Sequence, residues 1–412
     1  MDQNQPPHVR EEISVEKLAL LGGTPVRTSV LSYGQQWIEE QDIQAVVDTL
    51  KSPFITQGPA IDAFELAVAE SCGAKYAVAF TNGTAALHGA AFAAGIGPGD
   101  EVITSPITFV ASSNCVLYMG GTPVFADIDP RTYNLDPEVV RGKITDRTKA
   151  LIPVDFTGQP ADMEAFRKLA DEHGLVLIED AAHSLGASYQ GRKVGTLADM
   201  TMFSFHPVKH ITTGEGGIIV TDSEEYAEKL RLFRSHGITR EPSMLTKPEE
   251  GPWYHEMHAL GYNYRMTDLQ AALGNSQMKR LDEFVARRRE IVAAYDQAFA
   301  EFDGIVTPFQ QEDTNSSWHL YILRFTRDKF TASRKEIFEA LRAEGIGVNV
   351  HYIPVYTQPY YQALGYEKGL CPHAEALYEE IVTIPLFPKM TSEDIEDVVR
   401  AIGKVHAHFY KA

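Results

Sequence analysis

Short apolar runs alternate with amphipathic stretches along the first half of the chain. The runs typical of buried strands are residues 75–80 (KYAVAF), 101–105 (EVITS), 122–129 (TPVFADID), 148–156 (TKALIPVDF) and 175–180 (LVLIED). The segments expected to be helical are 81–95, about 107–118, and 161–174, which ends at a glycine. Strands that alternate with helices of this size imply crossover connections. The pattern therefore predicts an α/β fold with a mainly parallel sheet covered on both faces.

The second half of the chain has a different pattern. Helices are expected at 224–233 and over a long stretch at 267–299. The remainder mixes an apolar strand at 318–325 with helices at 333–345 and 392–405, which is typical of a separate, smaller α+β domain. The basic cluster ARRRE at 286–290 is interpreted as a solvated helix face.

The length of 412 residues is too great for one small core. We therefore expect a flexible N-terminal tail at 1–17, a large domain at 18–270, and a long helix with a small C-terminal domain at 271–412.

Composition and charge narrow the classes of function. The formal net charge of -19 argues against nucleic acid or an anionic membrane surface as the main partner. The polar N-terminus lacks the apolar centre of a signal peptide, and no apolar run approaches the roughly 20 residues of a membrane span. The expected location is the cytoplasm. Three widely spaced cysteines without a CxxC pair make a disulfide framework or a zinc site unexpected.

Polar residues gather where the predicted parallel strands end, which is where open α/β sheets bind ligands. Residues 81–84 (TNGT) open a helix, so their N–H groups and the helix dipole favour an anion. Asp180 ends a very apolar strand and His183 follows it. Phe109 lies just after another strand end, where an aromatic ring could cover a flat ligand. The alternatives are an ordinary turn and helix cap for the first two features and a core position for Phe109.

One segment, FSFHPVKHITTGEGGIIV at 203–220, places Lys209 between two apolar strands in a glycine-rich loop. One interpretation is a hairpin with a charged loop. The other is a reactive amine held in a pocket. A buried acid, an aromatic plate, an anion cradle and a lysine together suit pyridoxal phosphate (PLP). That cofactor needs a lysine for its Schiff base, an acid facing its ring nitrogen and donors for its phosphate.

Several longer motifs resemble the DegT family of sugar aminotransferases: SFHPVKHITTGEGG, TNGTAALH, IEDAAHSLGA, FRSHG and GYNYRMTDLQAALG. The resemblance extends from about residue 18 to the C-terminus. It implies a PLP enzyme of fold type I, active as a homodimer whose active sites lie at the subunit interface.

The resemblance also implies roles for individual residues. Lys209 would attach the cofactor and act as the catalytic base, Asp180 would face the pyridine nitrogen, and Phe109 would stack on the ring. The phosphate would be held by Gly83, Thr84 and Ser204, and by Asn263 across the dimer interface; His183 would lie near the phenolic oxygen. The residues expected on the substrate side are Thr56, His206, Glu215, Arg265, His319, His351 and Tyr352. For His319, His351 and Tyr352 the alternative is packing in the small domain.

The resemblance also implies which sugar the enzyme would act on. His206 before the lysine, Phe109 instead of a tryptophan, and the late stretch NVHYIPVYTQPYYQALGY are similar to the pseudaminic acid pathway aminotransferases. The implied reaction moves an amino group from L-glutamate to UDP-2-acetamido-2,6-dideoxy-β-L-arabino-hexos-4-ulose.

Several alternatives stay open. They are other nucleotide-linked keto sugars of the aminoarabinose, perosamine or bacillosamine type, an inositol-type ketone, a dehydratase of the same fold, and a non-catalytic regulator. The dehydratase branch of the family carries histidine where Lys209 stands. A nicotinamide-binding protein is disfavoured, because no GxGxxG follows the first strand.

Overall fold

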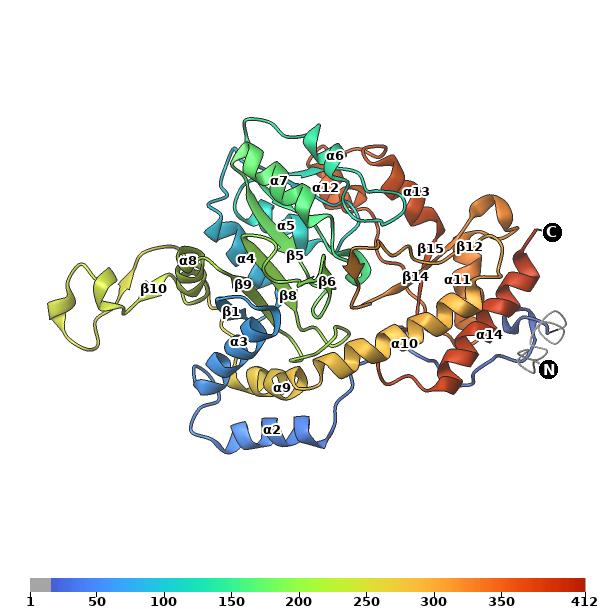
Figure 1. Cartoon of the computed structure of the whole chain (residues 1–412), viewed down its shortest axis with the longest axis horizontal. Helices are drawn as coiled ribbons and strands as arrows, with labels where there is room; N and C mark the ends of the chain where they lie inside the picture. The colour runs from blue at the N-terminus through green and yellow to red at the C-terminus, as the bar shows by residue number, and fades with distance from the viewer. Residues whose placement is uncertain (1–15, 412) are drawn as a thin grey trace.

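The first part of the chain is built around a seven-stranded sheet (Figure 1). This computed structural model describes residues 16–411, so most of the expected tail at 1–17 lies outside the described residues. In spatial order the strands are β1 (Tyr76–Phe80), β9 (Gly217–Thr221), β8 (Met200–Ser204), β5 (Val176–Asp180), β4 (Thr148–Ile152), β2 (Glu101–Thr104) and β3 (Thr122–Phe125). The strands from β8 to β3 run parallel, whereas β9 is antiparallel to both of its neighbours.

Helices cover both faces of this sheet. One face packs against α4 (Gly83–Ala93), α5 (Ala111–Tyr118) and α8 (Glu224–Arg234), and the other against α3 (Pro59–Cys72), α7 (Met163–His173) and α9 (Asp268–Met278). Neighbouring strand residues alternate between the two cores: Leu177 belongs to one and Ile178 to the other. Both faces are therefore apolar, which explains why these strands read as continuous apolar runs. The predicted fold class is confirmed.

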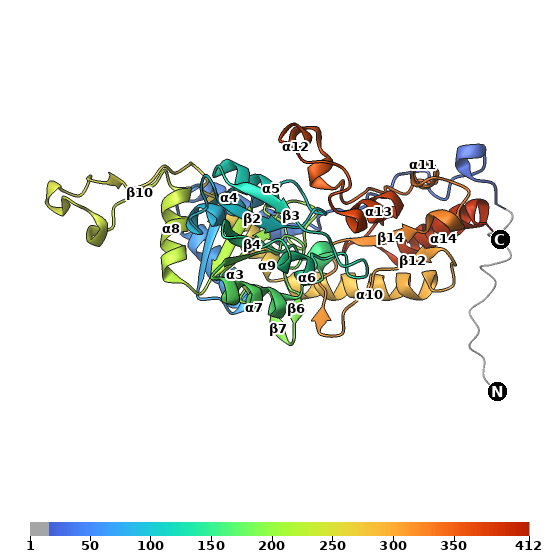
Figure 2. The same ribbon diagram turned by 90° about the horizontal axis from the view of Figure 1, so that it is seen from above.

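A second core lies at the C-terminal end of the chain (Figure 2). It contains an antiparallel sheet of β12 (Ile305–Val306), β14 (Tyr321–Phe325) and β15 (Ile381–Ile384). The helices around it are α10 (Leu281–Phe299), α11 (Arg334–Ala343) and α14 (Ser392–Phe409). Residues of α12 (Pro359–Ala363) and α13 (Pro372–Glu380) pack in a further apolar cluster with Phe125 of β3 and Ile322 of β14. Leu18 and Leu31 also pack in this second core. The domain limits at 18 and 270 stay predictions.

Shorter elements complete the described chain. They are α2 (Glu40–Lys51), α6 (Pro137–Arg141), β6 (Ser188–Tyr189), β7 (Arg192–Lys193), β10 (Ile238–Thr239), β11 (Glu256–Met257), β13 (Thr314–Asn315) and the 3-10 turns η1 (Ala19–Leu21), η2 (Phe156–Gly158), η3 (Pro242–Met244), η4 (Pro248–Glu250), η5 (Arg327–Lys329) and η6 (Val355–Thr357). The segment with β10 and β11 projects from the large domain as an arm (Figures 1 and 2).

Two predicted helices differ from the structure. The helix expected from about residue 107 begins at Ala111, because residues 105–110 form a turn that carries Phe109. The stretch expected as one helix at 267–299 is two, α9 and α10, separated at Arg280. The Arg280 guanidinium lies 2.9 Å from a Glu39 carboxylate oxygen and 4.5 Å from the centre of the Trp37 ring. These contacts connect the break between α9 and α10 to the segment that precedes α2.

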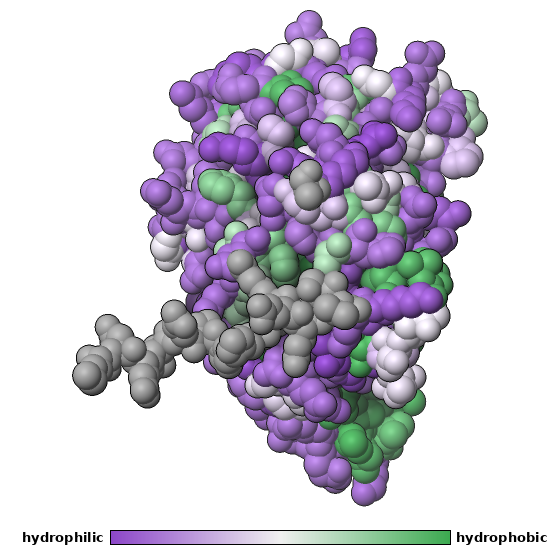
Figure 3. All heavy atoms as spheres, turned by 90° about the vertical axis from the view of Figure 1, so that its right-hand side faces the viewer, coloured by the Kyte–Doolittle hydropathy of each residue, from purple (hydrophilic) through white to green (hydrophobic). Residues whose placement is uncertain are grey.

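Hydrophilic side chains predominate on the face of the molecule shown in Figure 3, with smaller hydrophobic patches among them. Within residues 16–411, no helix combines the length and apolar character needed to cross a membrane. All three cysteines are buried and free.

The interpretation of ARRRE as a solvated helix face is wrong for its middle residue. Arg288 on α10 is fully buried. Its Nη1 lies 3.1, 3.1 and 2.9 Å from three carbonyl oxygens, those of Trp318, His319 and Leu386. Burial lowers the pKa of Arg288 to about 9. Helical periodicity explains the difference, since residues three and four apart share a face and Phe284, Ile291 and Val292 turn that face inward.

Arg288→Ala should therefore destabilise the protein by about 4 kcal/mol, because the change opens a cavity and leaves buried carbonyls without a donor. Its neighbour Arg287 is part-exposed and paired with Glu290. Arg287→Ala should cost about 1 kcal/mol or less. Urea unfolding of the two variants measures the difference, and equal effects would contradict the assigned burial.

Candidate active site

Lys209 lies in the loop that joins β8 to β9. These strands are antiparallel neighbours, with Ser204 opposite Gly217, so the segment is a wide hairpin. Backbone bonds from Phe205 N to Gly216 O (2.9 Å) and from Thr213 N to Phe205 O (3.1 Å) close its base. The hairpin interpretation and the pocket interpretation are therefore compatible, since the loop turns Lys209 inward to a partly buried position.

The Lys209 amine lies among groups that change its basicity. Its Nζ is 3.4 Å from His319 Nε2. Burial lowers the pKa of Lys209 to about 7, with the positive charge of Arg288 acting in the same direction and the Asp180 carboxylate acting against it. A large fraction of this amine is thus neutral at physiological pH, as a proton-transferring lysine requires.

Asp180 ends β5 with only 3% of its surface exposed. Its carboxylate accepts a hydrogen bond from Ser112 Oγ at 2.6 Å and another from the Ala182 amide at 3.2 Å. Burial raises the pKa of Asp180, while these two bonds and the charge of Lys209 oppose the rise. The buried acid is therefore partly compensated by donors on α5 and on the turn after β5.

Three histidines and a tyrosine surround the amine. The rings of His183 and His319 are 4.4 Å apart, and His183 Nε2 lies 3.2 Å from the Tyr352 hydroxyl. Burial first, and then the charge of Lys209, holds the pKa of His183 and of His319 well below the usual range. Burial also lowers the pKa of His351 to about 3, and its Nδ1 lies 2.9 Å from Thr383 Oγ1. The cluster is neutral and can act through hydrogen bonds rather than charge.

The first turn of α4 forms a cradle beside β8 and β9. Asn82 caps the helix by accepting from the Ala85 amide at 2.8 Å. A Cβ on Gly217 would lie 2.6 Å from the Gly83 nitrogen, so only glycine permits this approach. A Cβ on Gly83 would lie 3.4 Å from Ser204, which places Ser204 beside the same turn. Within the described residues the amides of Gly83 and Thr84 have no hydrogen-bond partner, which suits an anion.

Three of the remaining predicted residues, Phe109, His206 and Glu215, lie at the rim of the site. Phe109 is 59% exposed, with its ring 6.5 Å from that of Tyr352. His206 and Glu215 are exposed at the mouth of the Lys209 loop.

Three predicted residues form a separate group. Thr56 bridges to Thr267, and Asn263 bridges to Ser235. Arg265 lines a surface pocket together with Ser235. No hydrogen bond or ion pair in the described chain joins Thr56, Asn263 or Arg265 to Lys209. Their roles stay predictions.

Two residues next to the site were missed by the sequence analysis. Ser112 is an ordinary helical serine by pattern, yet its place one turn after Phe109 was a usable signal. Tyr33 contacts the His351 ring at 5.2 Å between centres, but it comes from the N-terminal segment and carries no local motif.

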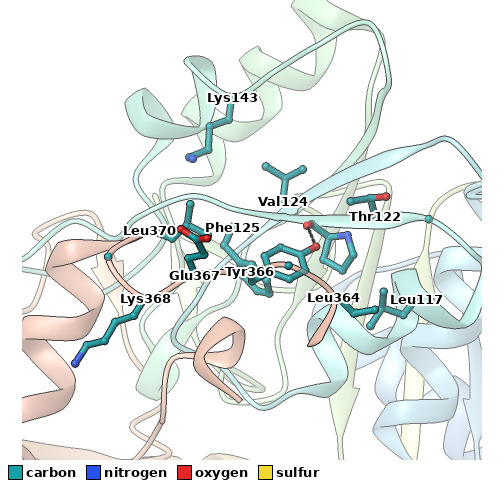
Figure 4. A pocket seen from close by; sticks show the side chains of 14 residues that line it. Leu117, Thr122, Val124, Phe125, Lys143, Leu364, Tyr366, Glu367, Lys368 and Leu370 are labelled. Atoms are coloured by element: carbon teal, nitrogen blue, oxygen red, sulfur yellow. Dashed lines mark hydrogen bonds between the residues drawn. The ribbon is translucent and has the colours of Figure 1, made fainter. Parts of the chain in front are cut away.

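A conspicuous surface pocket does not coincide with this site. About 730 Å³ in volume, it lies between β3 and the turn at 364–370 (Figure 4). Lys143 and Lys368 flank it, and the Tyr366 hydroxyl donates to the Pro123 carbonyl at its wall. None of the predicted site residues lines it.

The geometry agrees with the comparisons to known proteins. The profile of the DegT/DnrJ/EryC1/StrS aminotransferase family matches residues 36–403. The chain belongs to this family. The spore coat polysaccharide biosynthesis protein SpsC of Bacillus subtilis is 44% identical over 381 residues, covering 92% of this chain and 98% of SpsC.

Three solved structures of family members are similar. Helicobacter pylori PseC, an aminotransferase of pseudaminic acid biosynthesis, is 33% identical with a TM-score of 0.86, covering 92% of this chain and 100% of PseC. The PLP form of the putative sugar aminotransferase Spr1654 of Streptococcus pneumoniae is 32% identical (TM-score 0.85; 92% and 98% covered). DesI, studied with its TDP-sugar product, is 31% identical (TM-score 0.85; 95% and 96% covered).

The protein is accordingly a PLP-dependent aminotransferase that acts on nucleotide-linked keto sugars. The chemistry of the residues at this site fits PLP. Gly217 and Gly83 leave an anion cradle that a Cβ would fill, and the buried Nδ1 atoms of His183 and His319 have no hydrogen-bond partner within the described chain. Asp180 and Lys209 provide the acid and the amine that PLP chemistry requires.

The pKa of Lys209 yields a direct prediction. In the cofactor-free protein, Lys209 should react with an amine-selective reagent half-maximally near pH 7, because only the neutral amine is nucleophilic. Asp180→Asn removes a negative charge that raises the lysine pKa, so the half-maximal pH should fall further. Peptide mapping by mass spectrometry follows the modification.

Asp296→Asn is a matched control, because Asp296 is a carboxyl bonded to Tyr321 outside the site. It should leave the pH profile unchanged. A half-maximal pH above 9, or one unaffected by Asp180→Asn, would refute this account of the amine.

Proposed function

We propose that the protein transfers an amino group from L-glutamate to C-4 of UDP-2-acetamido-2,6-dideoxy-β-L-arabino-hexos-4-ulose. The product would be UDP-4-amino-4,6-dideoxy-N-acetyl-β-L-altrosamine, an intermediate of pseudaminic acid biosynthesis in the cytoplasm. The observation that carries the aminotransferase reaction is the partly buried Lys209 amine, which lies within the electrostatic influence of Asp180 and beside the neutral His183–His319 pair. The similarity to PseC and the presence of Phe109 support this sugar.

A second candidate is a different nucleotide-linked 4-keto sugar. The higher identity to SpsC, a protein of spore coat polysaccharide biosynthesis, favours it.

Each predicted residue has a part in this proposal. PLP, when bound, withdraws electrons from the carbon next to the transferred nitrogen and so acidifies its C–H bond. Lys209, neutral near pH 7, would take the proton from that carbon and deliver it to the cofactor carbon bonded to the same nitrogen. Asp180 would hold the proton on the ring nitrogen, and Phe109 would cover the ring. The neutral His183, positioned by the Tyr352 hydroxyl, would lie at the phenolic oxygen.

The phosphate would be held by the free amides of Gly83 and Thr84 and by the Ser204 hydroxyl. These groups lie together at the N-terminal end of α4, where the helix dipole favours an anion. His206, Glu215, His319 and His351 would contact glutamate or the nucleotide sugar.

The group of Thr56, Asn263 and Arg265, in which Thr56 and Asn263 are exposed and Arg265 is half-buried, supports a homodimer with shared active sites. Large apolar side chains are exposed beside it and on the arm, including Phe54 at 52%, Trp253 at 73% and Leu260 at 74%. Apolar surface of this kind marks interaction sites. In the proposed dimer it is covered, and Asn263 reaches the phosphate of the partner subunit.

A spectral half-reaction tests the substrate. The purified enzyme is loaded with PLP, converted to its pyridoxamine phosphate form with L-glutamate, and mixed with a panel of nucleotide 4-keto sugars. The yellow colour of the PLP form should return fastest with the UDP-L-arabino-hexos-4-ulose. Recovery with another sugar alone would favour the second candidate, and no conversion by L-glutamate would refute the donor.

The variant Lys209→Ala tests the proposed role of Lys209 in proton transfer. The variant should bind pyridoxamine phosphate yet lose turnover by about 10²- to 10⁴-fold, because it removes the proton-transferring group. Turnover close to that of the wild type would overturn the role of Lys209.

A further inference from the structure

Two buried carboxyl groups lie behind the site and take no part in the mechanism above. Asp155 follows β4, Glu179 immediately precedes Asp180 on β5, and both are 0% exposed. Val154 forms a parallel bridge with Asp180, so the side chains of Asp155 and Glu179 lie on the same face of neighbouring strands, and each carboxyl acts on the pKa of the other. Two carboxylates in contact in a dry interior repel strongly, so they cannot both be ionised without a cation between them.

The hydrogen-bond partners of the pair define its protonation. Glu179 Oε2 accepts from Thr201 Oγ1 at 2.9 Å, but Oε1 has no donor among the residues the structure describes. Asp155 accepts from Ser184 Oγ at 2.5 Å and from the Ala161 amide at 2.9 Å. A proton between the two carboxyls supplies the missing donor to Glu179 and removes the repulsion.

The pair is connected directly to the site. The Asp155 amide donates to the Asp180 carbonyl at 3.1 Å, and the Asp180 amide donates to Pro153. The Asp155 carboxyl holds Ser184, which follows His183 in the turn after β5. The pair therefore anchors both ends of the short segment that presents Asp180 and His183.

We propose that Asp155 and Glu179 share one proton and act as positioning residues that hold the turn carrying Asp180 and His183. The inference rests on the proposed roles of those two residues, but it concerns groups that touch neither cofactor nor substrate. It predicts that the turn loosens when the shared proton is lost.

The direction of the pH effect follows from the surroundings. Burial raises the pKa of Asp155 to about 7, and the negative charge of Asp180 contributes to the rise while the bonds from Ser184 and Ala161 oppose it. Burial raises the pKa of Glu179 too, with Arg192 as the opposing cation, and Glu179 in turn acts on the Cys72 thiol. Since the folded state binds the proton more tightly than the unfolded state, the stabilisation is present at low pH and is lost as pH rises through about 7.

Infrared spectroscopy of the holoenzyme tests the shared proton without any substrate. The wild type at pH 6 should show the C=O stretch of a buried protonated carboxyl, and Asp155→Asn and Glu179→Gln should each remove it. The control Asp296→Asn should leave it. A band that survives both amide substitutions, or its absence from the wild type, would overturn the proposal.

Thermal unfolding and kinetics test the positioning role. The melting temperature of the wild type should fall between pH 6 and pH 9, and Asp155→Asn should flatten this fall by about 3 °C, because its amide donates to Glu179 at every pH. Asp155→Ala should lower kcat roughly tenfold, since it leaves the Ser184 hydroxyl with only the longer bond to the Ala181 carbonyl at 3.4 Å, and Asp155→Asn should restore kcat.

An unchanged pH slope in Asp155→Asn, or failure of Asn to rescue the Ala variant, would count against the positioning role. The infrared and thermal results use no sugar substrate, so an incorrect sugar assignment would leave them unaffected.

Discussion

The structure depends on holding an amine and an acid together in a region that water does not easily reach. Burial pushes Lys209 towards its neutral form and Asp180 towards its protonated form, while each charge favours the other. The Asp180 carboxylate depends on Lys209 and on hydrogen-bond donors to stay charged, whereas Lys209 stays largely neutral because burial outweighs the attraction of Asp180. The hydrogen bond from Ser112 to Asp180 and the charge of the buried Arg288 also act on this balance. Asp180 ends β5 and Lys209 lies in the hairpin between β8 and β9, so the large sheet positions both groups.

The sheet explains why these groups meet. Asp180 ends β5, Ser204 ends the adjacent β8, and the cradle at Gly83 begins after β1, next to β9. Chain segments more than 100 residues apart therefore converge because their strands are neighbours and end at one edge. The antiparallel β9 is what allows the Lys209 loop to be a hairpin that returns to the same edge.

Much of this arrangement could be predicted from the sequence. Continuous apolar runs predicted the doubly covered sheet, and polar residues just after those runs predicted Asp180, His183 and the cradle. Ser112, Arg288, Asp155 and Glu179 could not be predicted in the same way. Their importance comes from partners on other elements, such as the carbonyls around Arg288. The apolar residues three and four positions away indicate that Arg288 faces inward, but they do not indicate what it binds. The break at Arg280 was missed because it depends on Glu39 and Trp37, which are far away in the sequence.

Arg288 lies on the long helix α10, which extends from the large sheet to the C-terminal core (Figure 1). Its guanidinium contacts backbone on both sides of His319 and also Leu386, and its charge lowers the pKa of Lys209. The reactivity of the amine is therefore linked to the docking of the C-terminal core on α10. Evolution could adjust the pH optimum of such an enzyme through residues that shift α10, while every group in contact with the cofactor or the sugar stays the same.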